Sequence, residues 1–329
     1  NNLKMSIGKQ MLMNLIVIYI FMLRKSTSHI PRPAFAGFGS KSSVPKKKNK
    51  ASKSTQTTKQ KILNPVDPQS RMEYISSRIQ RADISPLRQC ENPNTVVCID
   101  NFLGPELVIA MRKEAEALMP RMVPSQSTRW DETTQSIIPY EKEGVISYQI
   151  EGGPDGYAAS PILVEYIVTL TQQLSRKINE IVPSEFQLSD VKQTNKLAVC
   201  LGGGSKYDKH IDNLGGGQGD RRKLTALLYL QPPGSHDSHP DDNGEHDPRG
   251  GYFRAYDVPM DGMIQSFAPR GDRLLIFWSD SLVHDVSPSF VMDESIDKRW
   301  AITVWLIAND SGKIRDTDVD VERRHFGLG

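Results

Sequence analysis

The pattern of the C-terminal half is the feature that most constrains the fold. After residue 190, short apolar runs at 196–201, 224–230, 273–279 and 300–308 are separated by Gly, Pro and Asp. Runs of this kind are typical of β-strands. Because no helical pattern alternates with them, they favour a sandwich, barrel or jelly roll over a doubly wound sheet. We therefore predict a mainly β fold.

Two helices and one strand are predicted in the N-terminal half. A short β-branched strand covers 95–99, and apolar residues at three- and four-residue steps indicate a helix over 104–119. A second helix covers 160–182 and stops before Pro183. Both helices are expected to pack against the sheet, which makes the class α+β with supporting N-terminal helices.

The first 36 residues differ from the rest of the chain. An apolar run at 11–23 (MLMNLIVIYIFML) follows two lysines and precedes Ala34-Phe35-Ala36. Spanning a membrane takes about 20 apolar residues, so the run suits a signal peptide better, with an uncleaved anchor as the alternative. We expect entry into the secretory pathway, to the endoplasmic reticulum or onward to a plastid, and membrane association only through 11–23. A cytoplasmic or nuclear location is the alternative if the N-terminal gene model is wrong.

Charge is distributed unevenly along the chain. Residues 1–71 hold 14 of the 41 Lys and Arg residues and a single acid, Asp67, so the remainder carries 27 basic and 38 acidic residues. A folded part this acidic is not expected to bind nucleic acid. The expected division is a targeting segment at 1–36, a disordered basic linker at 37–70, a strand and supporting helices at 71–190, the β core at 191–310 and a charged tail at 311–329.

Several motifs are given structural interpretations. The three cysteines form no CxxC pair, and Cys98 and Cys200 are predicted to be small buried residues of apolar strands. The glycine clusters at 202–204 and 215–217 lack the Lys-Ser/Thr of a P-loop and are interpreted as tight turns. The His-rich segment at 232–249 is interpreted as a solvated loop, with a second metal site as the alternative.

Three side chains have the spacing of a metal site. His210 and Asp212 are two residues apart, so on an extended strand they point to the same face. His284 follows the run at 273–279 and can bring a third ligand to the same pocket. Two imidazoles and one carboxylate leave positions open for substrate and oxygen, which is the arrangement of non-haem Fe(II) oxygenases.

Arg299 lies 15 residues after His284, at the start of the next predicted strand. An Fe(II) oxygenase that uses 2-oxoglutarate must hold the distal carboxylate of this co-substrate, and a guanidinium group can do so with two parallel hydrogen bonds. Arg299 and Thr303 share a strand face, so Thr303 can assist, whereas Lys298 points the other way. A surface ion pair is the alternative role for Arg299.

The motifs occur in one order along the chain. They are Tyr207-x-x-His210-x-Asp212-Asn213, Leu224-Thr225-x4-Leu230 with Tyr229 inside it, Gly250-Gly251-x2-Arg254, Asp272-Arg273-Leu274-Leu275-x-Phe277-Trp278-Ser279-Asp280, His284-x-Val286-x-Pro288 and Arg299-x-Ala301-Ile302-Thr303-Val304-Trp305. Over 197–306 the chain resembles the Fe(II)/2-oxoglutarate prolyl hydroxylases, most strongly the egl-nine type that hydroxylates hypoxia-inducible factor. Residues 96–119 resemble the entry strand and first helix of that family more weakly.

The resemblance implies a double-stranded β-helix, or jelly roll. It implies that His210, Asp212 and His284 bind Fe(II), that Arg299 grips 2-oxoglutarate, that Tyr229 and Thr303 hydrogen-bond the distal carboxylate, and that Trp305 lines the pocket near the iron. The implied activity is the hydroxylation of a prolyl residue in a peptide or protein by O2, with ascorbate as reductant.

The chain departs from the egl-nine pattern in three places. Cys200 stands where those enzymes have a tyrosine near the co-substrate, and the segments 291–297 and 232–249 are apparent insertions. Two alternatives therefore stay open. One is a related 2-oxoglutarate oxygenase with a non-prolyl or small-molecule substrate, and the other is a non-catalytic jelly roll that binds metal or ligand as a sensor.

Overall fold

The computed structural model of the protein describes residues 67–131, 133–134, 136–213, 219–232, 248–257, 262–294 and 297–315. The expected targeting segment and almost all of the linker lie outside these residues. So do the glycine cluster at 215–217, most of the His-rich segment and most of the tail. The predictions made for those segments stay predictions.

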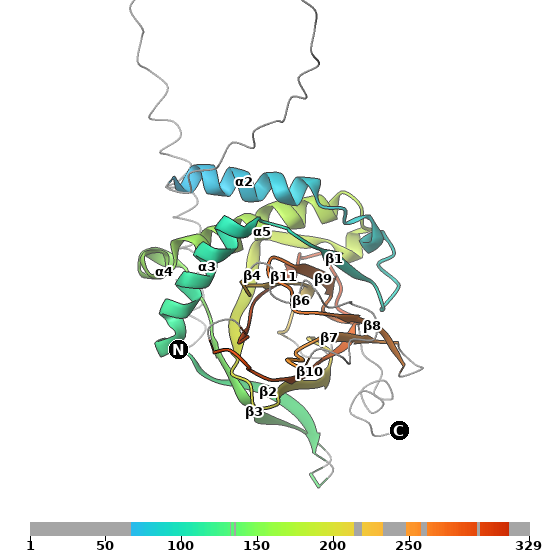
Figure 1. Ribbon diagram of the computed structural model, residues 1–329. Helices are drawn as coiled ribbons and strands as arrows, with labels where there is room; N and C mark the ends of the chain where they lie inside the picture. Colours follow the sequence, from blue (N-terminus) through green and yellow to red (C-terminus); the bar gives the residue numbers. More distant parts are fainter. Residues whose placement is uncertain are drawn as a thin grey trace, which may run out of the picture. The chain divides into compact units, whose positions relative to one another are not determined.

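Two antiparallel sheets form the β part of the fold (Figure 1). The larger sheet contains, in spatial order, β1 (Val96–Ile99), β9 (Leu274–Trp278), β6 (Arg222–Tyr229), β11 (Arg299–Ala308), β4 (Leu188–Cys200), β3 (Ser136–Tyr148) and β2 (Val123–Asp131). The smaller sheet contains β5 (Ser205–His210), β10 (Val283–Ser289), β7 (Phe253–Tyr256) and β8 (Met263–Phe267).

The chain passes repeatedly from one sheet to the other. It alternates between the sheets from β4 to β7, stays in the smaller sheet for β8, and alternates again from β8 to β11. As a result, strands distant in sequence become neighbours, and β11 lies between β6 and β4. This connectivity is that of a jelly roll, so the predicted fold class is confirmed.

Helices cover one face of the larger sheet. They are α2 (Pro68–Arg81), α3 (Pro105–Leu118), α4 (Gly153–Ala159) and α5 (Pro161–Asn179). In Figure 1, α2 and α5 lie side by side, and α5 packs against both α2 and β4. The apolar stripe of α5, including Leu163, Leu170 and Ile178, is fully buried in a core shared with the sheet. Helices and larger sheet therefore form one rigid support for the opposite face of the sheet.

The structure confirms the elements that the apolar pattern predicts and adds others. Each of the four predicted C-terminal runs falls on a strand, and α3 and α5 occupy the two predicted helices. The α2 helix and the β2–β3 hairpin were not predicted. Asp67 caps α2 by accepting a hydrogen bond from the Ser70 backbone N–H at 2.8 Å, so the last residues of the expected linker are helical.

Two smaller predictions have opposite outcomes. The cluster 202–204 is a tight turn between β4 and β5, because all three glycines have φ between +67° and +91°. The prediction that Cys98 is buried is wrong, whereas Cys200 is buried as expected. In β1, the strand period turns Val97 into the core and Cys98 outward.

Among the described residues, no helix has both the length and the apolar character needed to cross a bilayer.

Candidate active site

A cavity of about 940 Å³ is lined by strands of both sheets. From the larger sheet, every second residue of β11 lines the cavity. These residues are Arg299, Ala301, Thr303 and Trp305. This confirms the predicted shared face of Arg299 and Thr303. From the smaller sheet, His210 at the end of β5 and His284 on β10 face the same cavity. The jelly roll thus brings the predicted site residues to one place.

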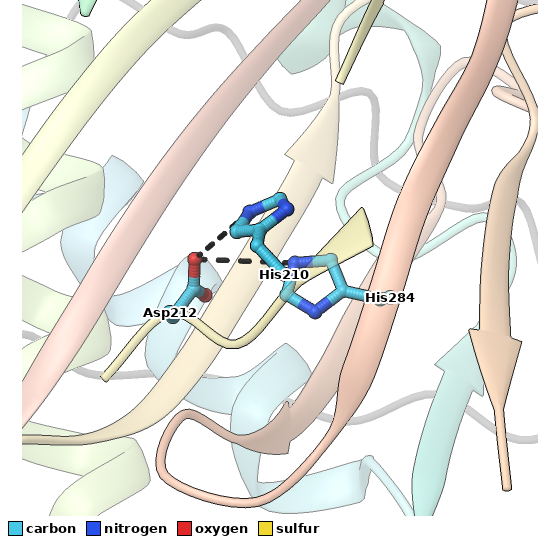
Figure 2. Close-up of side chains that lie close together, drawn as sticks. All are labelled: His210, Asp212 and His284. Atoms are coloured by element: carbon cyan, nitrogen blue, oxygen red, sulfur yellow. Dashed lines mark ion pairs between the residues drawn. The ribbon is translucent and has the colours of Figure 1, made fainter. Parts of the chain in front are cut away.

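The three predicted metal ligands lie together. His210 and His284 are register partners in the β5–β10 pair. Asp212 follows His210 and places its Oδ1 atom 3.7 Å from His210 Nε2 and 3.9 Å from His284 Nε2. Figure 2 shows the three side chains turned toward one another. One donor atom from each residue lies within 4.8 Å of the others.

Both imidazoles are oriented by backbone carbonyls. His210 Nδ1 lies 2.7 Å from the Asp208 oxygen, and His284 Nδ1 lies 3.1 Å from the Leu282 oxygen. A carbonyl only accepts, so each Nδ1 carries a proton and each Nε2 is turned toward Asp212. Burial, followed by the charge of His210, lowers the pKa of His284 to about 3. His284 is therefore a neutral imidazole, the form that binds metals.

The carboxylate of Asp212 is held by donors on the side away from the imidazoles. Its Oδ2 atom accepts hydrogen bonds from Thr225 Oγ1 at 2.7 Å and Trp305 Nε1 at 3.0 Å. Burial opposes ionisation, but the side chain of His210 makes the largest opposing contribution and holds the pKa of Asp212 well below its ordinary value. Trp305 thus lies near the ligands as the resemblance implied. Thr225 was not assigned a role from the sequence, although it lies within a quoted motif.

The donor set fits a first-row divalent metal. Two atoms bound to one ion at roughly 2.1 Å each can be at most about 4.2 Å apart, and both separations from Asp212 Oδ1 satisfy this limit. Two imidazoles and one carboxylate are the ligands that non-haem Fe(II) oxygenases use, with the remaining positions left for other ligands. The residues therefore fit iron.

Arg299 is a buried cation at the start of β11, four residues or more before the part of the strand that carries Thr303 and Trp305. Its side chain donates from Nε to the Gly251 carbonyl at 3.0 Å and from Nη2 to the Tyr229 hydroxyl at 3.1 Å. It forms no ion pair with any Asp or Glu of the described residues. A guanidinium is permanently charged and costly to bury alone, so this geometry suits an anionic ligand. The Sγ atom of Cys200 lies 4.0 Å from Nη1.

Tyr229 contacts Arg299, and Thr303 lies on the same strand as Arg299 and lines the cavity. Burial raises the pKa of Tyr229, so its hydroxyl keeps its proton. Because the oxygen accepts from Arg299, the proton can be donated to a further acceptor. Thr303 is half-buried and lines the cavity between Ala301 and Trp305.

Sequence reasoning missed two lysines of the cavity wall, Lys142 on β3 and Lys196 on β4. The Lys142 ammonium lies 3.8 Å from the centroid of the Tyr207 ring. Burial, followed by the charge of Lys196, lowers the pKa of Lys142 to about 7. Strand parity could have found Lys196, which is two residues from Ala198 on the inward face of β4. Lys142 had no such signal because β3 was not predicted.

Comparisons with known proteins agree with this site. The family profile described as the 2OG-Fe(II) oxygenase superfamily matches residues 196–307. The protein named hypoxia-inducible factor prolyl hydroxylase, from Caenorhabditis elegans, is 27% identical over 216 residues, which cover 63% of this chain and 26% of that protein. Egl nine homolog 1 of Rattus norvegicus is 27% identical over 229 residues, covering 67% and 57%. The matches thus span less than two thirds of either relative.

Two solved structures are similar to this chain at lower identity. A prolyl hydroxylase from Trichoplax adhaerens, in complex with a hypoxia-inducible factor peptide fragment, has a TM-score of 0.48 and 22% identity, covering 74% of this chain and 93% of that one. A Pseudomonas putida prolyl-4-hydroxylase has a TM-score of 0.48 and 19% identity, covering 71% and 99%. The residues matched by the family profile include His210, Asp212, His284 and Arg299.

Proposed function

We propose that this chain, whose residues 196–307 match the 2OG-Fe(II) oxygenase superfamily, hydroxylates a prolyl residue of a peptide or protein. The co-reactants are O2 and 2-oxoglutarate, and ascorbate is the reductant that restores Fe(II). The observation that supports this most strongly is that a His-Asp-His set and a buried arginine without a described acidic partner line the same cavity. A metal-binding module without activity has no need for the second feature.

His210, Asp212 and His284 are the residues that would hold Fe(II). When bound, the iron supplies the redox chemistry that couples O2 to oxidation of the co-substrate and substrate. The chain supplies orientation. The carbonyls of Asp208 and Leu282 fix the two rings, and the pair Thr225 and Trp305 fixes the carboxylate. Such supporting contacts determine ligand orientation and basicity.

Two phenylalanine rings pack against His284 and shield it from water. The His284 ring stacks on Phe253 at a centroid distance of 5.0 Å and meets the edge of Phe277 at 4.9 Å. Both phenyl groups are fully buried. These rings exclude water from one side of the site, which strengthens the electrostatic interactions within it.

Arg299 is the residue that binds the distal carboxylate of 2-oxoglutarate. Its guanidinium offers parallel N–H donors, and the Tyr229 hydroxyl beside it offers one more. Thr303 supplies a further hydroxyl on the same strand face. Cys200, at the position of the family tyrosine, offers only a weak S–H donor, so we expect weaker binding of 2-oxoglutarate than a tyrosine would give.

The prolyl substrate is supported by the relatives. The Caenorhabditis elegans relative is named as a prolyl hydroxylase of hypoxia-inducible factor, and it is 27% identical to this chain over 216 residues. The fold and triad alone fix the type of reaction and leave the target open. The test must therefore identify the modified residue.

The experiment uses the purified full chain with Fe(II), first without oxygen and then in air. Conversion of 2-oxoglutarate to succinate is followed with and without a library of proline-containing peptides. We expect iron-dependent succinate and a peptide product heavier by one oxygen atom, located on proline by fragmentation. The control is the same peptide with alanine in place of proline.

Two results would contradict the proposal at different levels. Iron-dependent succinate with modification of another residue, or with no peptide product, would remove the prolyl assignment and keep the oxygenase. Binding of Fe(II) and 2-oxoglutarate without any succinate would indicate a sensor.

A further inference from the structure

The cavity wall contains two lysines that the proposed reaction does not use. Lys142 is 8% exposed, and its ammonium rests against the face of Tyr207. Lys196 lies on the neighbouring strand, with its ammonium 5.9 Å from the centroid of the Trp305 ring. Neither forms an ion pair with an Asp or Glu of the described residues, whereas the buried Lys223 elsewhere in the fold is paired with Asp280 at 2.7 Å.

The positive charge of the cavity does not follow from composition. Its described lining contains five basic and two acidic residues, namely Arg121, Lys142, Lys196, Arg222, Arg299, Glu141 and Asp212. Of these, Arg222 is paired with Asp220 at 2.5 Å. Residues 72–329 as a whole carry 27 basic and 38 acidic residues. A basic cavity in an acidic domain focuses the field on anions.

The co-substrate does not account for this charge. Fe(II) with Asp212 has a net charge of about one, and Arg299 adds another. Together they balance the two carboxylates of 2-oxoglutarate. Lys142 and Lys196 are left over, and the charge of Lys196 lowers the pKa of Lys142. A further anion between the two ammonium groups would offset this repulsion and the cost of burial.

We infer that Lys142 and Lys196 bind a carboxylate side chain of the substrate, so that the enzyme selects peptides with Asp or Glu next to the hydroxylated residue. This inference rests on the proposed function and names its substrate class. The aromatic rings under the two ammonium groups hold them in place toward the cavity. The outer wall continues the pattern with the exposed Arg121 at the same cavity.

The test measures binding, apart from turnover. Fluorescein-labelled peptides with a central proline carry one Asp at successive flanking positions, and each has an Asn counterpart. Their dissociation constants for the full chain are measured by fluorescence anisotropy. We expect the Asp peptide to bind about tenfold more tightly than its Asn counterpart at one position or more, as a charge-assisted contact predicts.

Variants then assign the preference to the two lysines. Lys142→Met and Lys196→Met keep the length of the side chain and remove the charge, and each is expected to reduce the Asp preference to about twofold or less. Lys142→Arg should retain it. The matched control is Lys192→Met, on β4 but outside the cavity lining, which should leave the preference unchanged. The Asp-to-Asn change in the peptide does not touch the fold, so a double-mutant cycle isolates the contact.

Three outcomes would overturn the inference. One is equal binding of Asp and Asn peptides by the unaltered chain. Another is an Asp preference that survives both lysine variants. The last is a loss of 2-oxoglutarate affinity in Lys142→Met, measured by calorimetry without metal, with peptide binding unchanged, which would assign the lysines to the co-substrate.

The same peptides separate this inference from the proposed function. A second series has alanine in place of the central proline. An acidic preference that persists in the alanine series, together with no prolyl hydroxylation, would show that the proposed reaction fails while the carboxylate contact holds. Prolyl hydroxylation without any acidic preference would show the reverse.

Discussion

The helical layer and the cavity both bury positive charge, and they neutralise it differently. Between α2 and α5, Arg71 donates to both oxygens of Glu165 at 2.6 and 2.7 Å, and Tyr157 donates to the same carboxylate at 2.7 Å. In the cavity, Arg299 has only neutral partners among the described residues, the Gly251 carbonyl and the Tyr229 hydroxyl. Both guanidinium groups are less than a tenth exposed.

The difference separates a structural charge from a functional one. A buried ion pair that is complete within the chain costs little once formed, but it is strongly destabilising when one partner is removed. A buried cation without an anion in the chain lowers the stability of the fold, and an anionic ligand can offset this loss of free energy. The pairing of buried charge therefore distinguishes the support of this fold from its site.

The largest effect is expected at the metal ligands. His210→Ala should lower iron-dependent succinate formation by at least about a thousandfold, because the ligand set loses one of three donors. The free energy of unfolding without metal should change by less than about 1 kcal/mol, since His210 lies at the end of an edge strand. Lys209→Ala, at the adjacent position, is the control. Unchanged turnover in the His210 variant would rule out this residue as a ligand.

Breaking the ion pair of Arg71 and Glu165 should reduce stability and leave the binding of 2-oxoglutarate unchanged. Arg71→Met leaves Glu165 buried without its cation, so the free energy of unfolding in urea should fall by about 3–5 kcal/mol. The Michaelis constant for 2-oxoglutarate should not change. In the double variant with Glu165→Leu, much of the stability should return, because no charge is left unpaired. A double variant as unstable as Arg71→Met would contradict the role assigned to this pair.

Asp272 represents an intermediate case, a buried carboxylate that accepts from the backbone N–H groups of Leu103 and Gly104, each at 2.6 Å. Burial raises its pKa from 3.8 to about 6. The folded state then binds the proton more tightly than the unfolded chain, so stability from this group is full below about pH 4 and declines by roughly 3 kcal/mol as the pH rises through 6. Urea denaturation from pH 4 to 7 should show this slope.

The Asn variant provides the control for Asp272. Asp272→Asn removes the titration, and Asn tolerates the φ of +64° at this position. The slope between pH 4 and 6 should therefore be lost, whatever the absolute stability of the variant. A variant with the slope of the unaltered chain would place the titration on another group.

The smallest change in free energy is expected when the unpaired cation Arg299 is replaced. Arg299→Met should raise the Michaelis constant for 2-oxoglutarate by roughly 10- to 100-fold, which is the value of one or two charge-assisted hydrogen bonds. The free energy of unfolding should stay level or rise, because a buried cation without an acid is removed. A large loss of stability would show that Arg299 serves the fold as Arg71 does.

The sequence was informative where the strand period and the chemistry coincide. On β11, alternation alone places Arg299 and Thr303 on one face, and the cavity confirms it. The two-residue spacing of His210 and Asp212 likewise predicts their common direction. Such signals are local, so they are visible without knowing which strands pair.

Long-range contacts left no such signal. Arg71 and Glu165 are 94 residues apart, and neither flanking segment shows that the two meet. Lys142 reaches the cavity because β3 approaches β5 at Gly144, where a Cβ atom would lie 2.9 Å from that of Ser205. The polar residues of the β2–β3 hairpin show no apolar alternation from which that approach could be inferred. These features depend on tertiary packing.

The register pairing of His210 with His284 would link the stability of an edge strand to metal binding. β5 is an edge strand of its sheet, and its pairing with β10 contains two register shifts. An ion held by ligands from both strands acts as a clip that closes this edge, and at a hundredfold excess over its dissociation constant it would add about 2.7 kcal/mol. Chains without iron should open first at β5 and be degraded from there. The cell would then keep those copies that have acquired their metal.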